Sequence, residues 1–198
     1  MAVAERTRQR VSEPVEEPEP YTASELAEMA TAYPELRMEL TRDGELVIMA
    51  PTKVKTGNRN VKLSARLENW AEQTDSGETF DSSTLFTMPN GALRSPDACW
   101  IEKSRWETFT EEELEEFTLI CPDFVAELRS SSDRLSAVQK KMHEYMDNGA
   151  RLGWLIDPIS RRVEIYRPGQ DVEILDNPAS ISGEPILPGF TLDLKGIL

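Results

Sequence analysis

Two acidic side chains stand where a sheet protein normally places apolar residues. Asp97 lies between Pro96 and the apolar run 98–101, and Glu127 lies inside the apolar run 124–128. Burying an unpaired carboxylate costs several kcal/mol, so each acid needs a cation or a hydrogen-bond donor close by. A shared divalent metal would serve both, because hard ions such as Mg²⁺ or Mn²⁺ prefer carboxylate oxygens and water. We therefore expect a site that polarises a phosphodiester and activates water.

Each acid has a simpler alternative role. A lone carboxylate more often ends a strand or pairs with an arginine than binds a metal. The presence of two such acids, on two neighbouring strands, favours the functional interpretation.

A site of this kind also needs a cationic side chain that orients or deprotonates water and offsets developing charge. The helix expected after Glu127 offers Lys140 and Lys141. Its apolar stripe is formed by Leu135, Val138, Met142, Tyr145 and Met146. At about 100° per residue, Lys140 points roughly 170° from the centre of this stripe and Lys141 only roughly 90°. Lys141 is therefore expected to reach the edge of the sheet.

Arg129 is the rival cation. Alternation along a strand places it on the same face as Glu127. A guanidinium stays protonated in proteins and cannot act as a general base. We therefore assign Arg129 to charge stabilisation or phosphate binding.

The elements that position these residues can be read from hydrophobic spacing. Strands are expected in a hairpin over 36–49 that turns at Asp43-Gly44, in two strands over 80–101 around residues 89–91, in a central strand over 124–128 and in a hairpin over 154–166. Helices are expected after a capping box that begins at Thr22, over 57–73 and over 135–148. Helices interleaved with a mixed sheet indicate an α/β or α+β domain over residues 21–198.

Residues 1–20 have a different composition. They are rich in glutamate and proline and hold almost nothing large and apolar. Ordering such a segment costs conformational entropy without burial. We expect a disordered tail.

The overall composition narrows the functional classes. The chain has 198 residues and a formal net charge of -14, which excludes a generally basic surface that binds nucleic acid everywhere. Cys99 and Cys121 are too few for a disulfide framework, and we expect free thiols. No apolar run approaches the roughly 18 residues of a membrane span, and no secretory signal is visible. The cytoplasm is the expected location.

Basic residues are nevertheless concentrated in one segment. Between Leu46 and Leu67 the chain has no acid and five cations, which are Lys53, Lys55, Arg59, Lys62 and Arg66. A second basic cluster from Arg129 to Lys141 adds Arg134. Such a strip could follow the phosphate backbone of DNA. The alternative is an ordinary solvated helix face.

The ordered motifs resemble a known family. They are Ser95-Pro96-Asp97, then Pro122 to Ser130 with Glu127, then Lys141 to Tyr145 with Gly149, and then Trp154 to Pro158. In this order they are similar to the Uma family of restriction-endonuclease-like proteins, which is part of the PD-(D/E)XK nuclease superfamily. The likeness spans roughly residues 22–195.

The resemblance implies an α/β restriction-endonuclease-like core with a mixed sheet flanked by helices. It also implies a divalent metal held by Asp97 and Glu127, the signature lysine moved onto the following helix as Lys141, and Glu39 as an additional acid. One departure is that the signature Glu-X-Lys would place lysine at position 129, where this chain has Arg129. Another is that Asn58 and Asn60 stand where relatives often have histidine.

These observations give one leading hypothesis and one alternative. The first is a Mg²⁺- or Mn²⁺-dependent endonuclease that cleaves DNA, with a homodimer suited to cutting both strands of a duplex. The alternative is a catalytically inactive binding or accessory module that keeps the nuclease fold. Arg129 and the net charge of -14 favour the alternative.

Overall fold

The computed structural model describes residues 19–198. Residues 1–18 of the tail that we expect over residues 1–20 lie outside this range. The first element is helix α1 (Ala23–Ala32), which begins at Thr22 as the capping box predicts. The Thr22 hydroxyl accepts a hydrogen bond from the Glu25 N–H at 3.2 Å, and the Glu25 carboxylate accepts one from the Thr22 N–H at 2.8 Å. These bonds satisfy two donors that a helix start otherwise leaves unpaired.

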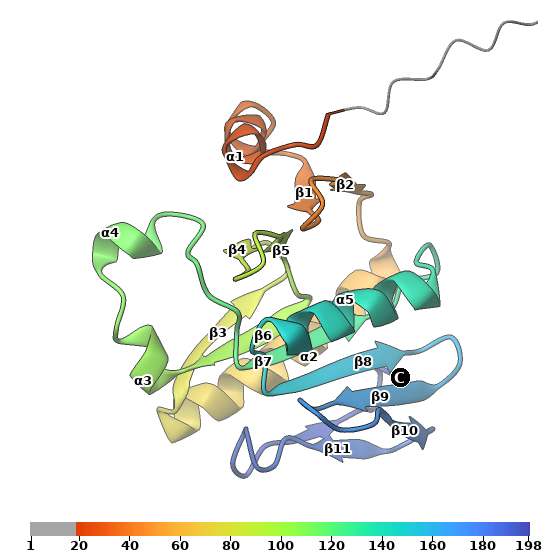
Figure 1. The fold of residues 1–198 in the computed structure, drawn as a ribbon. Helices are drawn as coiled ribbons and strands as arrows, with labels where there is room; N and C mark the ends of the chain where they lie inside the picture. Colours follow the sequence, from red (N-terminus) through yellow and green to blue (C-terminus); the bar gives the residue numbers. More distant parts are fainter. Residues whose placement is uncertain (1–18) are drawn as a thin grey trace, which may run out of the picture.

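A six-stranded mixed sheet forms the centre of the described structure (Figure 1). Its strand order is β10-β9-β8-β7-β6-β3. The strands are β3 (Gly77–Asp81), β6 (Ala98–Glu102), β7 (Phe124–Leu128), β8 (Leu152–Asp157), β9 (Arg162–Tyr166) and β10 (Glu173–Asp176). Strands β7 and β8 pair in parallel, and the other neighbouring strands of this sheet pair antiparallel. The parallel pair requires a crossover, which helix α5 (Leu135–Asp147) provides.

Two helices cover the two faces of this sheet (Figure 1). Helix α2 (Val54–Thr74) packs Leu63, Leu67 and Trp70 against one face, together with the carboxyl-terminal segment that holds strands β11 (Ser180–Ser182) and β12 (Thr191–Asp193). Helix α5 packs on the opposite face. The predicted mixed sheet with flanking helices is therefore confirmed.

A smaller sheet lies beside the first, with the order β2-β1-β5-β4. Its strands are β1 (Arg37–Leu40), β2 (Leu46–Met49), β4 (Phe86–Thr87) and β5 (Leu93–Arg94). Two short helices, α3 (Lys103–Trp106) and α4 (Glu111–Leu114), follow β6 in the chain. The β1–β2 hairpin turns near Gly44 as predicted, with a positive φ of 79° that glycine adopts at little cost. Strand β1 carries Glu39, whose carboxylate binds Lys141 of helix α5.

The prediction for residues 80–101 is only partly right. The turn around residues 89–91 joins the two short strands β4 and β5, but these belong to the smaller sheet. The flanking strands β3 and β6 pair with each other in the larger sheet. The chain therefore leaves one sheet, forms a hairpin in the other and returns, a path that local alternation cannot reveal.

The two predicted free thiols are confirmed, since neither Cys99 nor Cys121 is in a disulfide, and both are buried in the core beneath α5. Helix α2 begins three residues before the predicted position 57, so Gly57 lies inside it. None of the helices within residues 19–198 is long and apolar enough to cross a membrane.

Two glycine substitutions should change stability in opposite directions. A Cβ at Gly77 would lie 2.1 Å from the carbonyl oxygen of Ile101, so Gly77→Ala must push the β3 and β6 backbones apart. We expect the free energy of unfolding to fall by about 2 kcal/mol or more. Gly57→Ala, whose Cβ would meet only Thr52 at 3.9 Å, should raise it by about 0.5–1 kcal/mol. Urea denaturation measures both; equal effects would contradict the close approach at Gly77.

Candidate active site

Glu127 is a buried acid in the central strand β7. The side chains of Phe124, Ala126 and Leu128 belong to the core on the α2 side, so alternation turns Glu127 toward α5. There its Oε1 accepts a hydrogen bond from the Tyr145 hydroxyl at 3.0 Å and lies 2.8 Å from Nζ of Lys141. The carboxylate is thus anchored by two groups of one helix.

Lys141 lies between two carboxylates. Its Nζ donates to Glu39 Oε1 at 2.7 Å and to the Ser95 carbonyl at 3.2 Å, in addition to the contact with Glu127. The side chain is only 15% exposed, whereas Lys140 is exposed. The helix geometry therefore brings Lys141, and not Lys140, to the acids.

Arg94 connects the smaller sheet to helix α5. Its guanidinium lies 3.1 Å from Glu39 Oε2 and donates through Nε to Glu144 Oε2 at 2.6 Å. The Ser95 N–H also donates to Glu39 Oε1, at 2.9 Å. Three donors therefore bind Glu39. One of them, Arg94, also binds the carboxylate of Glu144 on α5.

Asp97 precedes β6 at a position that faces Glu127. Ala98 of β6 pairs with Ala126 of β7, so the next residues outward on the two strands are Asp97 and Glu127. Asp97 Oδ2 accepts from the Leu128 N–H at 2.7 Å, and Oδ1 accepts from Asn60 Nδ2 of helix α2 at 3.0 Å. The two acids predicted to share a cation thus come from facing positions on adjacent strands.

Comparison with known proteins identifies the family. The model of the Uma2 family, described as “Putative restriction endonuclease”, matches residues 23–195. The chain belongs to the Uma2 family. The crystal structure of a protein from Anabaena variabilis, described as a “putative nuclease”, matches with a TM-score of 0.72 and 22% identity, and covers 82% of this chain and 90% of that chain. Among curated proteins, none matches.

The structural match shows that this Uma2 protein has the restriction-endonuclease-like α/β fold. Membership of the family described as “Putative restriction endonuclease” supports a nuclease function.

The Uma2 site has more negatively charged groups than positively charged ones. Three carboxylates, Glu39, Asp97 and Glu127, face the cations Lys141 and Arg94. Burial raises the pKa of Glu127 to about 7, with further increase from the negative charges of Asp97 and Glu39 and only partial relief from Lys141. Burial also raises the pKa of Asp97, despite the N–H of Leu128. The cluster therefore has an excess of negative charge at Asp97 and Glu127.

The other two members of the cluster are held in their charged forms. Burial alone would raise the pKa of Glu39, but Lys141 and Arg94 outweigh it and lower this pKa below its usual value. Burial would lower the pKa of Lys141, but Glu127 and Glu39 together raise it well above that of a free lysine. Lys141 is thus an ammonium ion at any pH near neutral.

These features fit a divalent cation with two protein carboxylates. Within residues 19–198 there is no group of three or more His, Cys, Asp or Glu side chains placed to hold a metal ion. Mg²⁺ is commonly bound by one or two carboxylates and several waters, so Asp97 and Glu127 suffice. The Oδ1 atom of Asn60, which is buried beside Asp97 without a hydrogen-bond partner, is a further oxygen donor at this place.

The remaining predicted residues lie outside this cluster. Arg129 NH1 lies 2.8 Å from Asp157 Oδ2, and no hydrogen bond or ion pair within the described part of the chain joins Arg129 to Glu39, Asp97 or Glu127. Three of the six predicted DNA-binding side chains donate hydrogen bonds to protein oxygens, and the other three donate none within the described part of the chain. Lys53 binds the Ser131 hydroxyl, Lys62 the Gly196 carbonyl and Arg66 the carbonyls of Asp193 and Lys195, whereas Lys55, Arg59 and Arg134 make no such bond.

Four side chains of the site were missed by the sequence reasoning. Arg94, Glu144 and Tyr145 were not assigned a site role, and Asn60 was noted only as a departure from relatives. The signal for Arg94 was present, because an arginine directly before Ser95-Pro96-Asp97 and after two apolar residues must find a partner if it is buried. Tyr145 looked like one more member of an apolar stripe.

Removal of Arg94 alone should be strongly destabilising, because it leaves its buried partners without a counter-charge. Arg94→Met would leave Glu39 and Glu144 without this counter-charge, and we expect the free energy of unfolding to fall by about 3–5 kcal/mol. The matched control is Arg162→Met, whose pair with Asp176 is exposed on both sides and should be worth less than about 1 kcal/mol. Similar losses in the two variants, measured by urea denaturation, would refute the buried network.

The raised pKa of Glu127 predicts a pH dependence in metal-free protein. Its pKa is about 7 in the folded state and near 4.5 when unfolded, so the folded state binds more protons between these values and the wild type loses stability as pH rises through them. Glu127→Gln lacks this titration but keeps an oxygen for Tyr145 and Lys141. The variant should therefore gain stability relative to wild type between pH 5 and pH 8, measured by denaturation in EDTA. A constant difference would contradict the assignment.

Proposed function

We propose that this protein is a metal-dependent endonuclease that hydrolyses phosphodiester bonds of DNA. The observation that carries the proposal is the placement of Asp97, directly before β6, opposite Glu127 of β7, with the ammonium of Lys141 2.8 Å from Glu127. Family membership supports a nuclease function. Mg²⁺ or Mn²⁺ would be held by Asp97 and Glu127, and such an ion, when bound, polarises a phosphodiester and lowers the pKa of a water molecule.

The protein's own groups have separate tasks in this scheme. Lys141 keeps its proton, so it offsets the negative charge that develops on the phosphate and does not act as a general base. Glu39 does not serve as a metal ligand in this scheme, because its two oxygens are occupied by Lys141, Arg94 and the Ser95 N–H. We therefore assign Glu39 and Arg94 the task of positioning Lys141.

DNA binding and assembly follow from the same proposal. The cations Lys55, Arg59 and Arg134 make no ion pair among the described residues, so they remain available for phosphate contacts. One site cuts one strand, so a homodimer would suit cleavage of a duplex.

The second candidate is an inactive binding module that keeps the fold. Arg129 at the position of the family signature lysine favours it. The two functions differ in their response to Mg²⁺. Calorimetric titration of the metal-free protein should give heat that is lost in Asp97→Asn if the site is catalytic, and no heat if the acids only support the fold.

Substitution of Asp97 tests the proposed reaction directly. Asp97→Asn keeps the acceptor for Leu128 N–H but removes the charge, and we expect Mg²⁺-dependent cleavage of plasmid DNA to fall at least about 100-fold, within the range found for removal of one electrostatic group. The matched control is Glu164→Gln. Glu164 is as buried as Glu127 and lies on the same face of the sheet, but it binds Gln139 and Tyr166.

Glu164→Gln should cleave at nearly the wild-type rate, and circular dichroism should show that both variants are folded. Full activity in folded Asp97→Asn would refute the assignment.

A further inference from the structure

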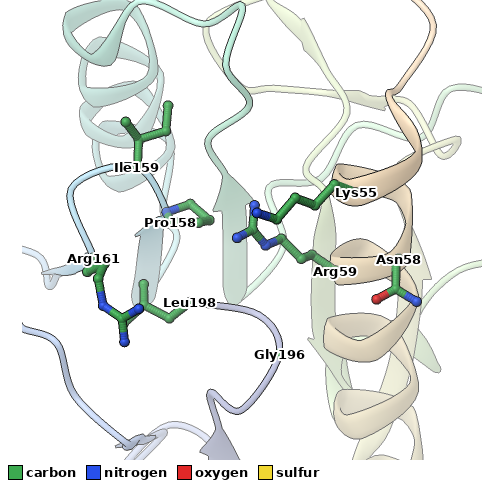
Figure 2. A pocket seen from close by; sticks show the side chains of 8 residues that line it. All are labelled: Lys55, Asn58, Arg59, Pro158, Ile159, Arg161, Gly196 and Leu198. Carbon is green, nitrogen blue, oxygen red and sulfur yellow. The ribbon is translucent and has the colours of Figure 1, made fainter.

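A cationic pocket lies at the start of α2, the helix that also supplies Asn60 to the candidate active site. It lies between the first two turns of α2 and the turn that joins β8 to β9, and has a volume of about 420 Å³, within the range of about 300–1,000 Å³ that is typical of ligand pockets. Figure 2 shows Lys55 and Arg59 extending from α2 toward Pro158, with Arg161 on the opposite side and Leu198 below.

The three cations of this pocket are not neutralised by acids. Among the described residues, no carboxylate side chain forms an ion pair with Lys55, Arg59 or Arg161. The neighbouring arginines Arg162 and Arg167, by contrast, each pair with an acid of strand β10. Even if a terminal carboxylate at Leu198 is counted against them, the pocket keeps an excess of positive charge in a chain whose net charge is -14.

Arg161 is held in an uncommon backbone conformation. Its φ is +57°, a left-handed value that residues other than glycine seldom adopt. Asn177 holds it there: the Asn177 N–H donates to the Arg161 carbonyl at 2.7 Å, and Nε of Arg161 donates to Asn177 Oδ1 at 2.8 Å. The guanidinium is therefore fixed by a neutral partner and keeps its full charge, with donors left for an anion.

Helix α2 joins the pocket to the active site, and the pocket also lies at the end of β8, the strand next to β7. On α2, Arg59 lines the pocket and the next residue, Asn60, binds Asp97. At the end of β8, Pro158 lines the pocket and the preceding residue, Asp157, binds Arg129 at the end of β7. A chain molecule that lies across the ends of β7 and β8 would therefore touch both.

The pocket also has an apolar wall. Pro158, the exposed Ile159 and Leu198 lie among the cations. A free inorganic anion gains nothing from such a surface, whereas a nucleotide unit places an apolar sugar next to each phosphate. We propose that this pocket binds a backbone phosphate and its sugar in the nucleic acid strand that is cut, next to the scissile bond. The inference rests on the proposed nuclease function and names a binding subsite for its substrate.

Charge-neutral variants test the subsite through binding, without cleavage. We would measure the affinity for a fluorescent oligonucleotide by anisotropy, in EDTA and over a range of salt concentrations. Arg161→Gln and Lys55→Gln should each weaken binding about 10-fold and reduce the slope of log affinity against log salt by about 1, since each removes one phosphate contact. Arg162→Gln removes the same charge from the next residue and should change neither.

The result that overturns the inference is an unchanged affinity and salt slope in both Arg161→Gln and Lys55→Gln. A competitor distinguishes the source of the phosphate. A nucleoside monophosphate should displace the oligonucleotide no better than salt at the same ionic strength. Displacement at micromolar concentration would show that the pocket binds a free nucleotide, and would refute the proposal that it binds a nucleic acid strand.

The same experiment separates this inference from the proposed function. If no cleavage is found with Mg²⁺ but the salt slope falls in Arg161→Gln, the pocket binds a nucleic acid backbone and the nuclease proposal fails. If cleavage depends on Asp97 while the two pocket variants bind like wild type, the subsite fails alone.

Discussion

The site depends on one constraint, which is that the carboxylates gathered around Lys141 and Arg94 outnumber these two cations. Glu39 and Glu127 lie on opposite sides of the Lys141 ammonium, at 2.7 and 2.8 Å, and Asp97 adds a third negative charge. A buried ion pair contributes little net stability, because desolvation offsets the attraction. The arrangement is therefore better explained by a need for negative charge at this place, which a bound cation would satisfy, than by stability of the fold.

The other elements of the structure bring these charged groups together. The β1–β2 hairpin and α1 carry Glu39 to the site, and Arg94 fastens that sheet to α5 through Glu144. The parallel pairing of β7 and β8 requires α5 as the crossover, and the same helix supplies Lys141 and Tyr145 to the strand that precedes it. The basic start of α2 lies on the helix that binds Asp97 through Asn60, so the proposed phosphate contacts and the proposed metal site are joined by one element.

The parts of the site that sequence reasoning found are those set by short spacing. The angle of Lys141 on its helix and the position of Glu127 in an apolar run follow from periods of 3.6 and 2 residues. Glu39 was named only through the family resemblance, because nothing in residues 36–49 shows what the hairpin packs against. The partners of Asn60 and Arg94 could not be assigned, since Asp97 and Glu144 are 37 and 50 residues away from them. The separation of β4 and β5 from β3 and β6 was missed for the same reason.

The long separations within the site have a consequence for folding. The bond between Lys141 and Glu39 joins residues 102 positions apart, and Glu39 and Ser95 are 56 positions apart. Closing such loops costs entropy that must be met before the contacts are gained. The charged groups can therefore meet only after both sheets and α5 have docked, so the chain acquires its chemistry at a late stage of assembly and partly folded forms lack it.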